Sequence, residues 1–261
     1  YKRQDLVAGI VRNFALDGVL QLKGQQIVSN PMPFRSDRLN GKLLVMADLK
    51  SGRYDVGIDG RISGLFIRGL GIVDLDSKLR AAPGANGAFG LSGNAVANVR
   101  RLDNAFLRGL GGGLPTVRSA LALLPGGEIG FSNMKLDAPL ISLNAKGVRH
   151  RDGTVHLEGN GSHKQYGPVN VVLDGKIDRP IVHVQLARPM DALGLRDVRG
   201  EFLPGADGNY SFTANGGSTL GPFTGEGRIL LPPGGQAVVR VARIAVSGVT
   251  ASGDIRPVTG G

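Results

Sequence analysis

Residues 53–62, RYDVGIDGRI, alternate between two kinds of side chain. Tyr54, Val56, Ile58 and Ile62 fall in one set with Gly60, whereas the other set consists of charged residues and one glycine. Successive side chains of a β-strand point to opposite faces of the sheet. The segment therefore predicts a strand with one apolar face and one charged face.

The same alternation recurs along most of the chain. Apolar residues stand at every second position in residues 43–49, 73–79, 155–157, 169–177, 182–186, 210–212, 239–241 and 249–255. Turn-forming pairs such as Asp152-Gly153 and Asp207-Gly208 separate these segments at the spacing typical of an all-β meander. Most of the chain is therefore predicted to be β-strand.

The composition is consistent with a folded β protein. The chain has 261 residues, 41% of them hydrophobic, and 42 glycines against an aromatic content of 5%. Such a hydrophobic content argues against disorder, and abundant glycine favours turns and close approaches between backbones. Alternating strands also build closed barrels and two-sheet sandwiches, in which the apolar faces pack against each other, so the pattern alone leaves open and closed architectures as alternatives.

One stretch departs from the alternation. In residues 114–124 the apolar side chains of Leu114, Val117, Leu121 and Leu124 follow a helical spacing, and residues 103–110 offer a second short helix. We therefore expect a helical hairpin at residues 102–127, between a strand block at residues 1–101 and another at residues 128–261. Each arm is too short to span a bilayer.

The sequence offers no catalytic or metal-binding motif. There is no cysteine, which excludes a disulfide, a thiolate nucleophile and a cysteine-ligated zinc. His156 and Glu158 share a strand face and could supply two metal ligands, with His150 or His163 as a third, but exposed residues of these types need no function. We expect no enzyme activity, no metal and no cofactor.

The net charge of +10 favours an anionic partner. Strand-based readers of nucleic acids present aromatic side chains on which bases stack, whereas this chain has few aromatic residues, mostly in the apolar sets. We therefore expect no nucleic-acid partner. A phospholipid or another anionic lipid remains a candidate partner, although the sign of the charge alone does not select it.

The strand and turn blocks VHLEGNGSHKQYGPVNVVLDGKI and VARIAVSGVTASGDIRP, with the insertion FLRGLGGGLPTVRSALALLPGGEI, resemble the TamB branch of the AsmA-like proteins of Gram-negative envelopes. The resemblance implies a mainly β fold, an elongated and curved antiparallel sheet that forms an apolar groove, with a short helical hairpin insertion. It also implies an internal segment of a periplasmic protein whose N-terminal helix anchors it in the inner membrane.

The family resemblance implies that such a groove carries phospholipid between the inner and outer membranes. Two alternatives remain: a scaffold for the assembly of outer-membrane β-barrel or secreted proteins, acting with an outer-membrane partner, and a closed sandwich or barrel that serves as a binding module. In the groove, Arg and Lys at the rims would meet anionic head groups. The residues that we expect to line it are Leu43, Val45, Tyr54, Val56, Ile58, Ile62, Val73, Leu75, Leu79, Val155, Leu157, Val169, Val171, Leu173, Val182, Val184, Leu186, Tyr210 and Phe212.

Overall fold

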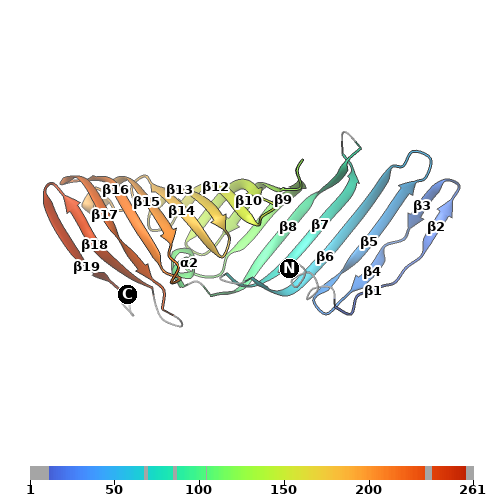
Figure 1. Cartoon of the computed structure of the whole chain (residues 1–261), viewed down its shortest axis with the longest axis horizontal. Helices are drawn as coiled ribbons and strands as arrows, with labels where there is room; N and C mark the ends of the chain where they lie inside the picture. Colours follow the sequence, from blue (N-terminus) through green and yellow to red (C-terminus); the bar gives the residue numbers. More distant parts are fainter. Residues whose placement is uncertain (1–11, 68–69, 85–86, 104, 233–236, 257–261) are drawn as a thin grey trace.

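A computed structural model describes residues 12–67, 70–84, 87–103, 105–232 and 237–256. Nearly all of the regular structure in these residues belongs to one sheet of 19 strands (Figure 1). The first eight strands are β1 (Ala15–Leu16), β2 (Leu20–Lys23), β3 (Gln26–Ser29), β4 (Met32–Arg35), β5 (Leu39–Asp48), β6 (Tyr54–Ile67), β7 (Gly71–Pro83) and β8 (Phe89–Leu102).

The sheet continues with β9 (Thr116–Leu123), β10 (Ile129–Asp137), β11 (Ile141–Arg149), β12 (Thr154–His163), β13 (Gly167–Lys176), β14 (Arg179–Leu186), β15 (Arg196–Pro204), β16 (Tyr210–Ser218), β17 (Gly221–Leu230), β18 (Val238–Val246) and β19 (Val249–Ile255). Within the described residues two short helical segments lie in the connections between strands, namely the α-helix α2 (Ala105–Gly111) and the 3₁₀ turn η1 (Asp191–Leu193). The prediction of a mainly β chain is confirmed.

The sheet is an antiparallel meander. From β5 to β19 every strand pairs with the strand that follows it in sequence, whereas β3 and β4 both pair with β5 and β1 pairs with β4. Two of the turns that the sequence predicts contain glycines at positive φ, Gly153 at 91° and Gly208 at 84°. Glycine adopts such angles without the steric cost that a Cβ atom brings, which explains the sharp reversals there.

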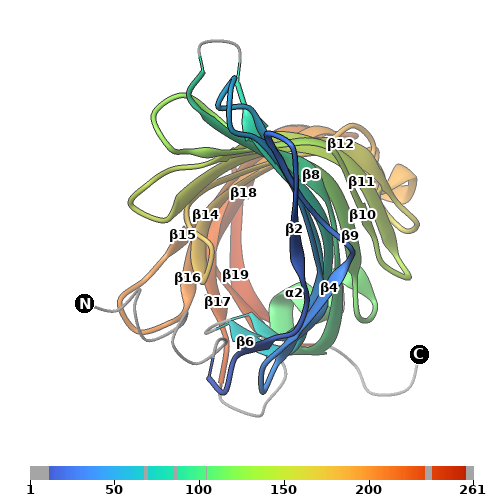
Figure 2. The same ribbon diagram turned by 90° about the vertical axis from the view of Figure 1, so that its right-hand side faces the viewer.

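The sheet is elongated and curved. In Figure 1 the strands follow one another along the long axis of the molecule, and Figure 2 shows that they bend around this axis. Helix α2 lies on the inner side of the bend (Figure 2). Within the described residues β19 pairs only with β18, so the sheet is open. The closed sandwich or barrel that the sequence pattern left possible is therefore not the architecture of this chain.

The expectation of a helical hairpin at residues 102–127 is wrong in its second arm. The first arm forms α2, but residues 116–123 form β9, which pairs with β8 on one side and β10 on the other. The sheet thus runs without interruption through the boundary that we expected between two strand blocks. Val117, Leu121 and Leu123 also stand at even spacing, so the same residues fit a strand, and pairing on both sides overrides the helical pattern.

Candidate functional site

One face of the sheet carries all nineteen residues that the sequence selects. The cross-strand register pairs Val45 with Val56 and Ile58 with Leu79, and further along it pairs Val171 with Val184. Directly opposed residues of an antiparallel pair point to the same side. Following these pairs from β5 to β16 places every selected residue on this surface, which we call the apolar face.

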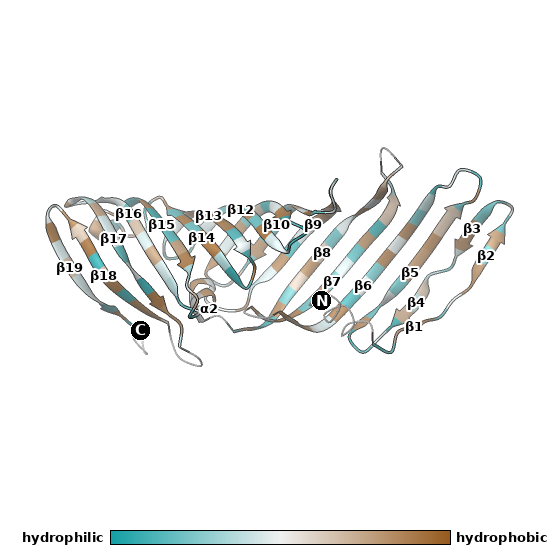
Figure 3. Ribbon diagram, viewed as in Figure 1, coloured by the Kyte–Doolittle hydropathy of each residue, from teal (hydrophilic) through white to brown (hydrophobic). Residues whose placement is uncertain are grey.

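The bulges in the strands preserve this segregation. Between β6 and β7 the register shifts after Ile62, and pairing resumes at Leu65, which faces Val73. A bulge adds a residue to one strand of a pair and so can return the apolar residues to the same side. The alternation of apolar and polar residues along individual strands is visible in Figure 3.

The apolar face is the inner, concave one. His163 lies on it as the register partner of Ile141, and its imidazole contacts α2, the helix on the inner side of the bend (Figure 2). Of the nineteen selected residues, Val73, Val155, Val169, Val182 and Tyr210 are buried, and the other fourteen are partly exposed.

The side chains of the apolar face are not fully enclosed by the protein. Val56, Ile58, Val171 and Leu173 are each partly exposed, and among the described residues no large side chain is fully buried. The accessible surface is 16276 Å² for a chain of 27.2 kDa. A compact monomer of this mass exposes only roughly 10,900 Å². The excess surface is what a single curved sheet without a covering second layer produces.

Small residues widen the space over this face. Gly41 faces Gly60, and Ala145 faces Gly159, in rows that otherwise carry valine, leucine and isoleucine. A Cβ atom at Gly41 would lie 2.2 Å from the carbonyl oxygen of Asp59 and 2.4 Å from the Phe34 ring, so that glycine is required by close packing. Others, such as Gly225, have no such neighbour and leave the sheet surface bare.

The opposite face carries charged residues in cross-strand pairs. Arg80 binds Asp55 with two hydrogen bonds, and Lys146 lies 3.7 Å from Glu158. The pKa of Asp55 lies below its ordinary value because of the hydrogen bonds from Arg80. Near a turn, hydrogen bonds from Asn209, with a smaller contribution from Arg228, lower the pKa of Asp207 to about 2. The charged pairs suit this polar face to contact with solvent.

The histidine and carboxylate residues considered as metal ligands do not converge. His156 Nδ1 lies 2.6 Å from Asp174, and its Nε2 lies 3.3 Å from Glu158. His150 instead pairs with Glu128, and His163 lies on the apolar face. Within the described residues no group of three His, Asp or Glu side chains is arranged to hold a metal ion.

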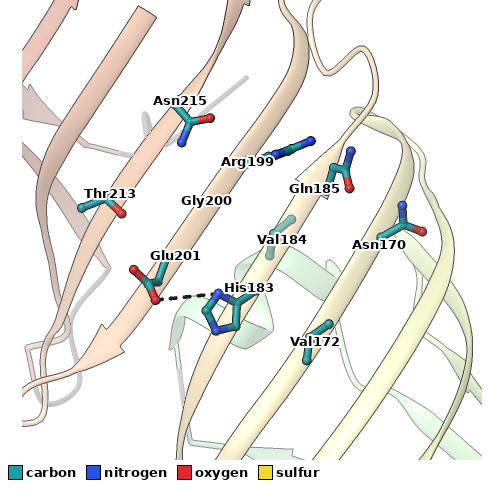
Figure 4. Close-up of a pocket in the computed structure, with 10 residues that line it drawn as sticks. All are labelled: Asn170, Val172, His183, Val184, Gln185, Arg199, Gly200, Glu201, Thr213 and Asn215. Carbon is teal, nitrogen blue, oxygen red and sulfur yellow. Dashed lines mark ion pairs between the residues drawn. The ribbon is translucent and has the colours of Figure 1, made fainter.

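The polar face also has a shallow hollow of about 420 Å³ over β13 to β16 (Figure 4). Asn170, Gln185, Arg199 and Asn215 line it in successive strands, and His183 lies 3.8 Å from Glu201 across it. Sequence reasoning missed this hollow. Its lining residues share a face and a row only through the register of four strands, which the sequence does not reveal.

The described cations near the turns are exposed. Lys50 follows β5, Lys164 follows β12 and Arg188 follows β14, and each side chain is open to solvent. Arg108 lies on α2 and is also exposed. These positions at the ends of the strands are where we expected basic residues to border the groove.

No family model, curated protein or solved structure matches this chain. In the described part of the chain, no helix combines the length and the apolar character needed to cross a membrane.

Proposed function

We propose that the apolar face binds phospholipid acyl chains and that the curved sheet serves as a segment of a non-enzymatic lipid-transfer conduit. The observation that supports this most is the partial exposure of a continuous apolar face from β5 to β16, with no second layer of the described structure packed against it. An uncovered apolar surface of this extent is costly in water and usually marks a binding surface.

The energetics of such binding need no specific polar contact. Withdrawing an acyl chain from water gains about 0.8 kcal/mol per methylene group. Strands lie about 4.8 Å apart, so the apolar face from β5 to β16 is on the order of 55 Å long. Successive rows of valine, leucine and isoleucine offer similar surroundings, which lowers the barrier to movement along the sheet. Exposed cations such as Lys164 and Arg188 supply charge for anionic head groups.

The proposed setting is the periplasm, in a parent protein anchored in the inner membrane. This setting rests on the resemblance to the TamB branch of the AsmA-like proteins. The proposed lipid class is an anionic phospholipid.

A second function has one supporting observation. The edge strand β19 (Val249–Ile255) is exposed throughout and pairs with β18 alone within the described residues. An unpaired edge can accept a strand from another chain, as a scaffold for outer-membrane β-barrel proteins would require. A partner of this kind would bind at the edge through backbone hydrogen bonds, whereas a lipid would bind on the apolar face.

Val171 and Val172 provide a matched pair for the test. They are adjacent in β13 and both partly exposed, but Val171 lies on the apolar face and Val172 on the polar face. A photoreactive amino acid at position 171, activated in cells, is expected to capture phospholipid, and the same probe at position 172 is not. Mass spectrometry of the adducts identifies what was captured.

The outcomes separate the two functions. Phospholipid captured at position 171 and not at position 172 supports the conduit. Protein captured at a probe on β19, with no lipid at position 171, supports the scaffold instead. Equal capture of lipid at positions 171 and 172 would show nonspecific contact and contradict the proposal.

A further inference from the structure

Helix α2 depends on contacts with the sheet for its stability. It spans seven residues, Ala105–Gly111, and isolated helices of this length do not persist in water. The carbonyl groups at its C-terminal end have no partners within the helix. Two of them are bound from the ends of neighbouring strands: Leu110 O accepts from His163 Nε2 at 3.0 Å, and Gly111 O accepts from the backbone N–H of Leu140 at 2.9 Å.

The first of these contacts comes from a highly constrained imidazole. His163 is 3% exposed, and its ring stacks on Tyr166 with 4.5 Å between the ring centroids. Its Nδ1 accepts hydrogen bonds from the backbone N–H groups of Gln165 and Tyr166, at 3.1 and 3.3 Å. A ring nitrogen that accepts cannot also carry the proton, so the proton lies on Nε2, which donates to Leu110 O. The turn after β12 thus holds the imidazole in the tautomer that binds α2.

The same contacts lie at the apolar face where β11 begins and β12 ends, in the interior of the strand order. Ile141 follows Leu140 in the chain and is the register partner of His163, so it lies between the two residues that hold α2. Ile141 is buried, whereas Val171, two strands further along the sheet, is partly exposed.

The segment after α2 is suited to such movement. Gly112 and Gly113 follow the helix with φ angles of 67° and 155°. Glycine has the widest choice of backbone angles, and hinges consist of a few residues in loops or at the ends of elements, often small ones. The contacts from His163 and Leu140 described above are among those that would have to break.

We propose that α2 is a movable partition of the lipid-binding face, fastened by His163, and that its release opens the floor around Ile141 to an acyl chain. This inference rests on the proposed lipid binding and adds a regulatory step to it. His163 is a positioning residue in this scheme, because it acts on the lipid site through α2.

A disulfide can test the movement directly. A Cβ atom built at Gly111 lies 3.5 Å from the Cβ of Ala138, within the range found in disulfides. The chain contains no cysteine, so the double variant Gly111→Cys/Ala138→Cys has a single possible intramolecular pair. Oxidation ties α2 to the turn before β11, and reduction releases it. The single variant Gly111→Cys controls for the added side chain.

The readout is lipid capture by a small aliphatic diazirine amino acid at position 141, with position 171 as the reference. The protein is incubated with vesicles of phosphatidylethanolamine and phosphatidylglycerol in equal amounts. We expect capture at position 141 in the reduced double variant, loss of that capture on oxidation, and capture at position 171 in both states. In protein without the two cysteines, His163→Ala is expected to increase lipid capture at position 141. This increase should be the same with oxidant and with reductant.

Two results would overturn the partition. Equal capture at position 141 in the oxidised and reduced proteins would show that α2 does not control access. Absence of capture at position 141 in both states, with capture at position 171, would show that α2 is a fixed cover. A failure at position 171 as well would remove the proposed lipid binding itself, and the partition with it.

Discussion

Arg80 in β7 and Asp55 in β6 are diagonal neighbours on the polar face, since Gly57 is the direct partner of Arg80, and the guanidinium binds both carboxylate oxygens, at 2.8 and 2.6 Å. This geometry holds the pKa of Asp55 below its ordinary value. We predict that Arg80→Gln raises the pKa of Asp55 toward that value, as followed by NMR titration of the carboxyl carbon. Stability should change little, because the arginine side chain is largely exposed and exposed pairs are screened by solvent. An unchanged titration would show that the pair does not persist in solution.

The pKa of the His156 imidazole can be tested in the same way. Its hydrogen bond to Asp174, with a smaller contribution from Glu158, raises the pKa of His156 above 6.5. A raised pKa in the folded state means that the pairing stabilises the protein below pH 6.5 and that this contribution is lost as the pH rises through the raised pKa. Asp174→Asn is predicted to lower the pKa of His156, measured from its imidazole NMR signals. Asn170→Ala, on the same strand and face, is the control and should leave it unchanged.

Two glycines should respond differently to substitution by alanine. A Cβ atom at Gly161 in β12 would lie 1.9 Å from the carbonyl oxygen of Ser142, whereas one at Gly57 in β6 would meet only Leu44, at 3.7 Å. We expect Gly161→Ala to destabilise the protein by about 1–3 kcal/mol, as overpacked sites do, with Gly57→Ala close to neutral. Urea denaturation followed by circular dichroism compares them. Equal midpoints would mean that β11 and β12 can separate to admit the methyl group.

Ile229 marks the best-packed point of the C-terminal strands. It is 2% exposed in β17 and pairs with the buried Tyr210, whereas Leu220, in the turn before the same strand, is 73% exposed. Ile229→Ala is predicted to cost roughly 2–5 kcal/mol in the free energy of unfolding. Leu220→Ala serves as the comparison and should cost far less. A small effect at position 229 would indicate that these strands contribute little to the cooperative unfolding unit.

The sequence was sufficient to predict which side chains share a face. Side-chain direction in a strand has a period of two, so the alternation in residues 53–62 already separates Val56 and Ile58 from Asp55 and Asp59. The structure adds how the strands are joined. Val171 and Val184, for example, become neighbours only through the pairing of β13 with β14.

Local pattern was insufficient at residues 114–124. Leu114, Val117, Leu121 and Leu124 fit a helical stripe, but Val117, Leu121 and Leu123 fit a strand equally well. Residues 116–123 form a strand because they hydrogen-bond to β8 and β10. Such pairing depends on residues outside the segment, which its local pattern does not include. The contact of His163 with α2 was missed for a similar reason, since it joins residues 53 positions apart.

The meander order of the strands determines how the length of the sheet can change. From β5 onward each strand is bonded to its immediate neighbours in sequence, so an additional pair of strands could be inserted at a turn without rearranging the others. The inserted hairpin would have to keep its apolar side chains on the same face as those of the neighbouring strands, because a register shift by one residue moves them to the opposite face. The length of the sheet can therefore change in steps of one hairpin while the apolar and polar faces are kept.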